Sequence, residues 1–406
     1  AMSLGLSAMG GILFLGGGST VTIAQRMFEG MNSFALLAIP LYTFAGFTMS
    51  KGGISKRLMD FCYSIVGHIY GGLAHVNVLS SMIFAGISGS AVADTAGVSG
   101  MFMPEMIRKG YSKNFTVAVT AISSTIGIII PPSIPMVVIA GICGISTGKL
   151  FLGGIIPGIL CGLAQMIVSY FLAKKEGVPK EPGHFTIGPV LHGLWESWPA
   201  LLMPIIIVGT ITMGIVSPTE AGVIAVVYGL FAGGIIYREL KWEDIKFAFA
   251  ETVRTSGRIF IVIGAAKLYT VMLTTAGFDK WVAKTMLGFS TNPTVILIMI
   301  LLIFFIVTMF MESIATLTLF MPILYPIALG VGINPIVLSV LITVVIGIGL
   351  VTPPVGMCIY VACDLMDTTV GEVFPTLVPF IAATFVCIAL MVAFPQLILL
   401  PTYLMA

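Results

Sequence analysis

Long apolar runs separated by short polar links recur along the whole chain. Each of the clearest runs approaches the length of about 20 residues that crosses the hydrocarbon core of a bilayer as a helix. These runs are Leu152–Ala173, Leu201–Val216, Ala221–Tyr237, Thr294–Met311 and Leu377–Leu400. A signal peptide occurs only once, at the N-terminus. The pattern therefore predicts an all-α integral membrane protein with many spans. The chain also begins inside an apolar segment, and we expect that a first helix is missing before it.

Composition agrees with this prediction. Of the 406 residues, 58% are hydrophobic and 9% are charged, whereas a soluble domain carries about 25% charged residues. The net charge is +2 and no basic run alternates with aromatic residues, so we expect no nucleic-acid partner. The six cysteines show no CxxC spacing, which favours small buried side chains over disulfides or a metal centre.

Basic residues gather at four places along the chain. The groups are Lys51, Lys56 and Arg57; Arg108, Lys109 and Lys113; Lys174, Lys175 and Lys180; and Arg238, Lys241 and Lys246. The positive-inside rule places all four groups in the cytoplasm. Lys241–Thr252 alternates charged and apolar residues, which predicts a helix lying in the membrane interface.

The two halves of the chain resemble each other. Ile126–Pro132 ends in a proline pair and reappears as Ile348–Pro354, 222 positions later. The same offset pairs Pro104 with Pro326, Gly110 with Gly332, and Pro157 with Pro379. Such agreement between prolines and glycines at one offset indicates a duplicated unit.

The charges indicate that the two copies point in opposite directions. The turn after Pro104 holds Arg108, Lys109 and Lys113, whereas its counterpart, Gly330–Pro335, holds no charged residue. The first turn is therefore expected in the cytoplasm and the second on the other side. Inverted repeats are typical of secondary transporters, which bind substrate near the bilayer midplane at broken helices.

Each copy contains a polar segment inside an apolar stretch, here called a tip. The first tip is Gly86–Thr95 and the second is Met311–Thr316. The apolar stretches beside the first tip are too short to span. We therefore expect two re-entrant hairpins, whose irregular backbone is tolerated at depth only where it is buried in protein or lines a cavity.

Each copy also contains a Gly-x-x-x-Pro-Pro segment, here called a break. The first break is Gly127–Pro132 and the second is Gly349–Pro354. Consecutive prolines remove amide donors and disrupt helical bonding, so we expect two unwound transmembrane helices with carbonyl oxygens free to bind a cation. The helix that follows each break offers its positive N-terminus to an anion.

These features predict two sodium sites related by the repeat, with a solute between them. The first site is predicted at Ser88, Ser90, Gly127, Ile130 and Pro131, and the second at Glu312, Ser313, Thr316, Gly349, Thr352 and Pro353. The predicted substrate-binding residues are Ser88, Ser90, Asp94, Ser133 and Thr352. The alternative is that these small residues only let helices pack closely, which is harder to accept for four segments in two matched pairs.

Asp94 and Glu312 are the acidic residues of the tips. An acid at membrane depth costs roughly 2.5–3.5 kcal/mol, so a functional role is the default expectation. The alternative is that each carboxylate caps the N-terminus of a helix.

Motifs for enzymes are unconvincing. Gly144–Gly148 fits Gly-x-Ser-x-Gly, but it ends an apolar helix instead of following a strand. The glycine spacing before Lys149 does not fit a phosphate loop, and His68 and His75 lack further metal ligands in the sequence. We therefore expect no enzymatic activity.

Several motifs resemble a known family. They are Leu37–Leu41, Gly52–Leu58, Gly67-His68, Ser88–Ala93, Ile130–Pro135, Ser217–Gly222 and Gly349–Gly356. Together they resemble the large membrane (M) subunit of tripartite ATP-independent periplasmic (TRAP) transporters, nearly from end to end. We expect that the family's first transmembrane helix is largely absent from the chain.

The resemblance implies uptake of a small organic anion across a bacterial inner membrane, driven by two or more Na⁺ ions. It also implies an elevator mechanism and two partners, a small membrane (Q) subunit and a periplasmic substrate-binding protein (P subunit). Ser88, Ser90 and Asp94 match the first hairpin tip, and the proline pairs match the unwound sodium-binding helices. Family substrates are mostly carboxylates, and the first tip resembles that of sialic acid and sugar-acid members.

The expected organisation has four parts. Residues 1–72 form N-terminal scaffold and arm helices, and residues 174–291 form further scaffold and interfacial arm helices. Residues 73–173 form the first repeat of the transport domain, with a hairpin at 73–110 and a broken helix at 114–147. Residues 292–406 form the second repeat, with a hairpin at 293–330 and a broken helix at 335–366.

Three other functions are compatible with parts of this pattern. A stand-alone sodium-coupled anion transporter would need no binding protein, and uptake by the chain alone would support it. A channel would conduct without a sodium gradient and would not need two matched cation sites. An intramembrane enzyme is disfavoured because no catalytic group has an evident partner.

Overall fold

The computed structural model describes residues 2–14, 20–178 and 185–405. Regular structure in these residues is entirely helical, as the sequence predicts. The helices of the first half are α1 (Met2–Phe14), α2 (Thr20–Met31), η1 (Phe34–Leu37), α3 (Ala38–Lys51), α4 (Ile54–Val66), α5 (Gly72–Ser88), α6 (Ala91–Arg108), α7 (Lys113–Ser124), η2 (Thr125–Ile128), α8 (Ile134–Cys143) and α9 (Thr147–Glu176).

The second half continues with helices of similar length. They are α10 (Ile187–Thr212), α11 (Pro218–Phe231), η3 (Ala232–Ile236), α12 (Trp242–Thr275), α13 (Phe278–Phe289), α14 (Pro293–Thr308), α15 (Ser313–Gly330), α16 (Pro335–Gly349), α17 (Met357–Asp364), α18 (Val370–Ala393), α19 (Gln396–Leu399) and η4 (Leu400–Met405).

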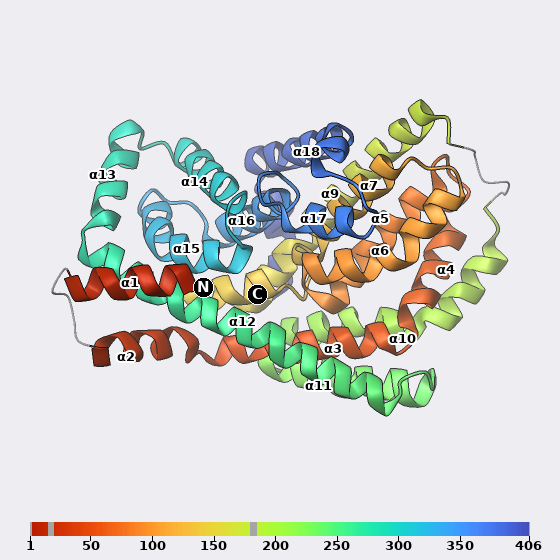
Figure 1. The fold of residues 1–406 in the computed structure, drawn as a ribbon, viewed down its shortest axis with the longest axis horizontal. Helices are drawn as coiled ribbons and strands as arrows, with labels where there is room; N and C mark the ends of the chain where they lie inside the picture. Colours follow the sequence, from red (N-terminus) through yellow and green to blue (C-terminus); the bar gives the residue numbers. More distant parts are fainter. Residues whose placement is uncertain (1, 15–19, 179–184, 406) are drawn as a thin grey trace.

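Figure 1 shows how these helices are arranged. In the upper part of the view, α5, α6 and α7 lie on the right, α14, α15 and α16 on the left, and α9, α17 and α18 between them. The helices α3, α11 and α12 run along their lower edge, α4 and α10 lie at the right, and α1, α2 and α13 lie at the left. The segments around both proline pairs therefore lie inside a frame of longer helices.

Seven helical stretches in the described residues are long and apolar enough to cross a membrane. They include α9, α10, α12, α15 and α18, whereas α5, α8, α14 and α16 are apolar but shorter. The chain is thus a multi-pass membrane protein. The predicted interfacial helix Lys241–Thr252 is the beginning of α12, which continues without a break to Thr275. The helix is longer than predicted because apolar residues continue it past Thr252, where the alternation of charged and apolar residues ends.

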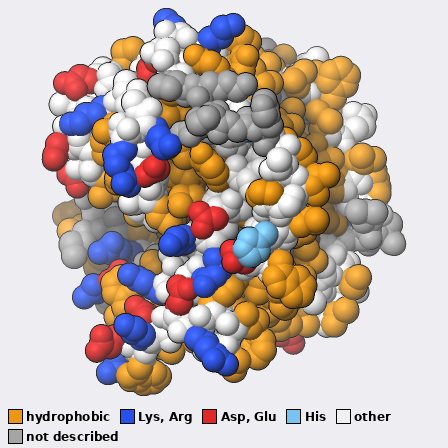
Figure 2. Space-filling model, turned by 90° about the vertical axis from the view of Figure 1, so that its right-hand side faces the viewer, with side chains coloured by type: hydrophobic (Ala, Val, Ile, Leu, Met, Phe, Trp, Pro, Cys, Tyr) orange, Lys and Arg blue, Asp and Glu red, His pale blue; other side chains and the backbone are white. Residues whose placement is uncertain are grey.

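The surface of the molecule has a charged part and an apolar part, as expected of a protein that contacts both water and lipid. Figure 2 shows the end of the molecule that carries α4 and α10, with charged side chains gathered on one side and a broad hydrophobic area on the other. On this end Arg57 of α4 binds Glu239 at 2.6 Å and lies 4.3 Å from the centre of the Tyr237 ring. These contacts join α4 to the link that precedes α12.

Both predicted breaks interrupt their helices. The first helix ends as a 3₁₀ turn at Ile128, and α8 starts at Ile134. The second ends at Gly349, and α17 starts at Met357. The two broken helices cross each other, because Gly347 of α16 lies against Thr125 and Ile128 of η2.

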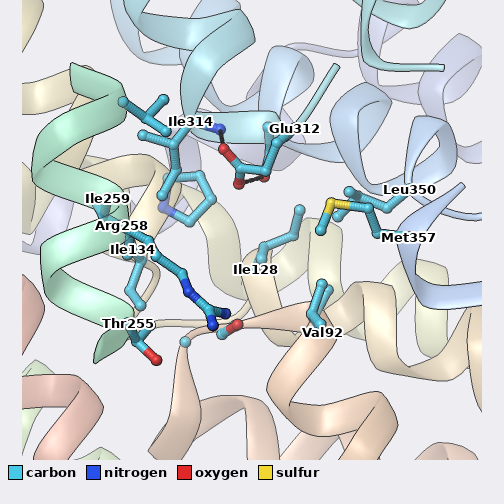
Figure 3. A pocket seen from close by; sticks show the side chains of 16 residues that line it. Val92, Ile128, Ile134, Thr255, Arg258, Ile259, Glu312, Ile314, Leu350 and Met357 are labelled. Atoms are coloured by element: carbon cyan, nitrogen blue, oxygen red, sulfur yellow. Dashed lines mark hydrogen bonds between the residues drawn. The ribbon is translucent and has the colours of Figure 1, made fainter. Parts of the chain in front are cut away.

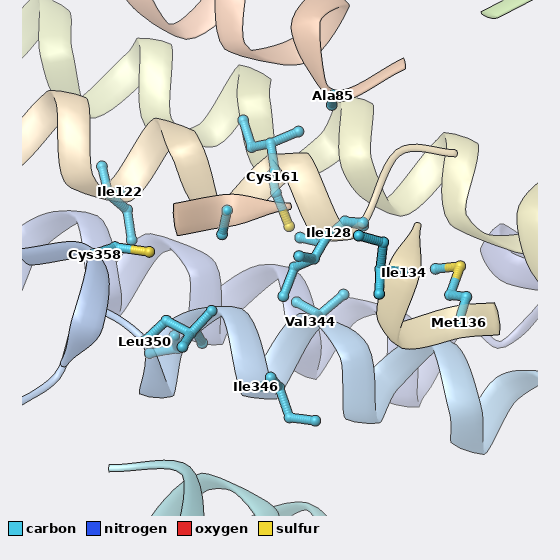
Figure 4. Close-up of a cluster of buried hydrophobic side chains, with 14 of the residues drawn as sticks. Ala85, Ile122, Ile128, Ile134, Met136, Cys161, Val344, Ile346, Leu350 and Cys358 are labelled. Atoms are coloured by element: carbon cyan, nitrogen blue, oxygen red, sulfur yellow. The ribbon is translucent and has the colours of Figure 1, made fainter. Parts of the chain in front are cut away.

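The crossing lies in the largest cluster of buried apolar side chains. Figure 4 shows Ile128 and Ile134 beside Val344, with Leu350 and Cys358 in the same cluster. Most of the irregular backbone is thus enclosed by protein, as its position at membrane depth requires, whereas Pro354 and the following Val355 are exposed.

Helix α9 approaches the first break closely through glycines. A Cβ atom at Gly154 would lie within 3 Å of Met136 Cε and still closer to the carbonyl oxygen of Ile129, and one at Gly158 would collide with the Ile130 side chain. Real Cβ atoms do not approach their neighbours so closely. These glycines therefore let α9 support the break from behind.

We expect Gly158→Val to destabilise the protein by about 1–3 kcal/mol, because the new side chain overpacks the contact with Ile130. Gly209→Val in α10 is the matched control, since a Cβ at Gly209 meets nothing within 4 Å. Thermal unfolding in detergent, followed by size-exclusion chromatography, compares the two variants. Equal melting temperatures would contradict the proposed support of the break by α9.

Candidate functional site

The first tip packs directly against the first break. The amide of Ile134, two residues after the proline pair, donates to the carbonyl oxygen of Gly89 at 3.2 Å. Ser90 caps α6, since its hydroxyl accepts from the Ala93 amide at 3.4 Å. The tip and the unwound segment therefore form one polar unit inside the apolar core.

Asp94 lies at the centre of this unit. It is only 1% exposed. The Ser88 hydroxyl donates a hydrogen bond to Asp94 Oδ1, whereas Oδ2 has no hydrogen-bond partner among the described residues. Oδ2 faces Gly127, where a Cβ atom would collide with it. Because a buried charge needs a counter-charge, this orphan oxygen beside the first break is a fitting ligand for a small cation.

The other predicted residues of the first copy have different surroundings. The Ser133 hydroxyl donates to the Ile128 carbonyl oxygen at 2.5 Å and accepts from the Met136 amide at 3.3 Å, so it bridges the break and caps α8. The Ile130 side chain faces Gly158 of α9. The carbonyl oxygen of Pro131 faces Gly86 of α5.

The second copy has a similar contact, between the end of α14, just before the second tip, and the second break. The amide of Val355 donates to the carbonyl oxygen of Met309 at 2.9 Å, and Gly349 packs against Thr308 at the end of α14. Thr352 lies three residues after Gly349, and its hydroxyl donates to the Ile348 carbonyl oxygen at 2.7 Å. In both halves of the chain, a backbone hydrogen bond therefore joins the break to residues at or just before the tip.

Glu312 is the N-cap of α15. Its Oε2 accepts from the amides of Ile314 and Ala315 at 2.9 and 3.2 Å, and its Oε1 accepts from the Ser313 hydroxyl at 2.9 Å. The Thr316 hydroxyl donates to the Glu312 carbonyl oxygen at 3.1 Å. The capping role considered for both acids thus applies to Glu312, whereas the Asp94 carboxylate bonds to Ser88 instead.

A cavity of about 210 Å³ separates the two tips. Its lining comes from both tips, both breaks and α12, and consists of Gly89, Ser90, Ala91, Val92, Ile128, Ile134, Pro135, Thr255, Arg258, Ile259, Val262, Glu312, Ser313, Ile314, Leu350 and Met357. Figure 3 shows Arg258 reaching from α12 into this space, with Glu312 on another side of it. We call it the Arg258 cavity.

Arg258 is the cationic side chain of this cavity and lies near the middle of α12. No carboxylate among the described residues pairs with it, whereas its neighbour Arg254 pairs with Glu251 at 2.7 Å. A charged side chain at the centre of a spanning helix costs roughly 2.5–3.5 kcal/mol. An unpaired arginine that faces a cavity there is therefore suited to bind an anion.

Helix ends add to the positive character of the cavity. The first turns of α6, α8, α15 and α17 all contribute lining residues. The N-terminus of a helix carries a partial positive charge, which favours anions. Ser90, Ser133 and Glu312 already accept hydrogen bonds from end amides of α6, α8 and α15, so these three ends contribute mainly their partial charge. The remaining lining is largely apolar, so the arrangement fits a small organic anion.

The structure brings some of the predicted site residues into the cavity and leaves others outside. Ser90, Glu312 and Ser313 line it. The others lie outside the cavity: Ile130 faces α9 and Thr316 bonds to Glu312 within α15, whereas most of the rest lie at or beside the tips and breaks. Their assignments remain predictions. Arg258 was not predicted, although an arginine directly before the apolar run Ile259–Ala266 was a signal for it.

Comparisons with known proteins agree with the helical membrane architecture. The family described as "Tripartite ATP-independent periplasmic transporter, DctM component" matches residues 1–397. The chain is 36% identical to the sialic acid TRAP transporter large permease protein SiaM of Vibrio cholerae, over 93% of this chain and 88% of that protein. It is 34% identical to the C4-dicarboxylate large permease protein DctM of Pseudomonas aeruginosa, over 99% and 94% respectively.

A longer relative is the isethionate TRAP transporter permease protein DctMQ of Oleidesulfovibrio alaskensis. The chain is 36% identical to it and spans 94% of its own length but 60% of that protein. These relatives are transporter permeases and not enzymes, which confirms the expectation that the chain is no enzyme.

Solved structures share the fold at low sequence identity. The YdaH transporter of Alcanivorax borkumensis has a TM-score of 0.61 at 13% identity, over 91% of this chain and 86% of that one. MtrF of Neisseria gonorrhoeae has a TM-score of 0.59 at 14% identity, over 92% and 84%. The end-to-end family match and the identity to SiaM and DctM show that the chain belongs to the family of TRAP transporter large permease (DctM) components.

Proposed function

We propose that this chain carries a small organic anion across the membrane in symport with sodium. The single observation that carries the proposal is the unpaired Arg258 in a cavity between two tips and four helix N-termini. One guanidinium binds one carboxylate in a bidentate manner, and the apolar lining accommodates the rest of the molecule. A monocarboxylate such as sialic acid or a sugar acid fits this single cation better than a dicarboxylate does.

Sodium coupling is supported by the contact of each break with residues at or just before the tip of the same half. Sodium prefers oxygen ligands, and the Asp94 Oδ2 atom, the Ser88 hydroxyl and the backbone beside Gly127 lie together in the first copy. We place the first sodium ion there, so Asp94 serves the cation and not the substrate. The second ion belongs at the matching contact, near Gly349, Thr352 and the cap formed by Glu312.

The lengths of the helices support re-entrant hairpins. Helices α5 and α14 have 17 and 16 residues, which at 1.5 Å per residue is about 24–26 Å, less than the roughly 30 Å of a bilayer core. Each is followed by a reversal and a helix that packs against it. With the charge asymmetry of the repeats, this favours an inverted repeat.

The position of the cavity supports an elevator mechanism. Arg258 belongs to the expected scaffold range 174–291, whereas the tips and breaks belong to the two expected repeats, 73–173 and 292–406. The bound anion would therefore sit between the two parts. Sliding of the repeats against α12 would carry the site across the membrane.

The family implies two partners and a location. The relatives named "large permease protein" imply a smaller one, and the greater length of DctMQ is consistent with a second subunit in the same chain. We propose that the chain works in a bacterial inner membrane with a small membrane subunit and a periplasmic substrate-binding protein. A stand-alone transporter remains the alternative, which uptake by the chain alone would support.

We expect Arg258→Gln to abolish uptake, or lower it at least 100-fold, because the substrate carboxylate loses its only cationic partner in the cavity. Arg254→Gln is the matched control, one turn away on the same helix and paired with Glu251. Uptake of radiolabelled N-acetylneuraminic acid, succinate and isethionate is measured in proteoliposomes that also contain the two partners. Full uptake by Arg258→Gln would refute the assignment of this cavity.

We expect Asp94→Asn to raise the sodium concentration for half-maximal uptake about tenfold or more and to lower the Hill coefficient for sodium. The amide has the shape of the carboxylate but lacks its charge. Glu105→Gln on the same helix is the control, since Glu105 pairs with Arg108 at 2.6 Å, outside the cavity. An unchanged sodium dependence would exclude Asp94 as a sodium ligand.

A further inference from the structure

A second cavity lies further along the same helices. Its volume is about 360 Å³, and its polar lining includes Glu29, Asn32, Ser33, Lys267 and Thr318. Glu29 and Asn32 are exposed, so the cavity opens at the surface of the chain. We call it the Lys267 cavity.

The two cavities are consecutive along three shared helices. Helix α8 contributes Ile134 to the first cavity and Val138 to the second, and α15 contributes Ser313 and then Thr318. On α12, Lys267 follows Arg258 by nine residues, which is about 14 Å along the helix axis. Each cavity thus receives one basic side chain from α12.

Lys267 is available for an anion. Glu29, the acidic residue in the lining of this cavity, pairs with Arg26 at 2.8 Å, and no carboxylate among the described residues forms an ion pair with Lys267. The Arg26 guanidinium lowers the pKa of the Glu29 carboxyl, and Lys267 lowers it further to a smaller extent. The side chains of Arg26, Glu29 and Lys267 have a net charge of +1, and the uncompensated charge is that of Lys267.

Two further donors are unused beside Lys267. The side-chain amide of Asn32 makes no hydrogen bond with another described residue, and the Ser33 hydroxyl caps nothing although Ser33 is the N-cap of η1. The stem of Lys267 packs against Gly30, where a Cβ atom would lie 2.6 Å from Lys267 Cβ. Packing against α2 therefore holds the lysine beside both donors.

We propose that the Lys267 cavity is a second binding site for the transported anion, which its carboxylate or sulfonate occupies before it reaches Arg258. The proposal rests on the function proposed above. The basic groups at Lys51, Arg57 and Lys246 mark the cytoplasmic side, and Lys246 lies in the first turns of α12. Lys267 lies toward the other end of that helix, on the side where a periplasmic binding protein would release its ligand.

We expect Lys267→Gln to lower uptake at limiting substrate about three- to tenfold, with the maximal rate changed less than twofold. Lys267→Arg should restore uptake because it keeps the charge. Lys280→Gln is the matched control, an exposed lysine on α13 that lines neither cavity. The assay uses the reconstituted complex and whichever of N-acetylneuraminic acid, succinate or isethionate the wild type takes up.

Ionic strength separates a charge effect from a structural one. Choline chloride added at constant sodium should reduce the difference between wild type and Lys267→Gln, because Lys267 is only half-buried and salt screens the attraction of a charge that solvent can reach. A defect that salt does not change, or uptake equal to that of Lys280→Gln, would overturn the proposal.

Equilibrium binding to the purified chain, without binding protein, tests the site directly. The wild type should bind two anions per chain at saturation, and Arg258→Gln and Lys267→Gln one each. One anion per wild-type chain would overturn the second site while leaving the Arg258 cavity intact. Absence of uptake by the wild-type complex would instead refute the proposed function itself.

Discussion

Backbone hydrogen bonding in a medium without water is the constraint on which this structure depends. A helix that stops at membrane depth leaves amides and carbonyls that lipid cannot satisfy. Here the first tip meets the broken helix of its half through Ile134 to Gly89, and the residue Met309 just before the second tip meets the second broken helix through Val355. The hydroxyl of Ser133 and the carboxylate of Glu312 bind further free groups. Tip and break therefore need each other, and their meeting places helix ends around one cavity.

This constraint explains why so much of the architecture could be predicted from the sequence. Proline pairs cannot continue a helix, so Pro131-Pro132 and Pro353-Pro354 located both breaks, and the structure places helix ends on either side of them. The polar tips could be recognised because small polar residues are rare inside long apolar runs. Local chemistry decides these features, and it is visible in the sequence.

The details of the site depend on contacts between distant segments, which no local pattern reveals. Arg258 lies 168 residues from Ser90 and 54 from Glu312, and only the fold brings α12 beside both tips. Its helix was read from the sequence as an interfacial segment ending at Thr252, so the residues beyond it were given no role. Likewise, the sequence could not distinguish Glu312, which caps its helix, from Asp94, whose second carboxylate oxygen remains without a partner.

The positions of Asp94 and Ser90 provide a physical route for coupling between the two proposed ligands. Asp94 lies one helical turn beyond Ser90, which lines the cavity, so an ionised Asp94 repels an anion bound there. Two like charges about 6–8 Å apart interact by about 2–3 kcal/mol at an effective dielectric constant of about 20. A sodium ion on Asp94 removes this repulsion, which corresponds to a roughly 30- to 150-fold gain in affinity for the anion. Because such coupling is reciprocal, the anion strengthens sodium binding by the same factor, and symport then needs no direct contact between anion and cation.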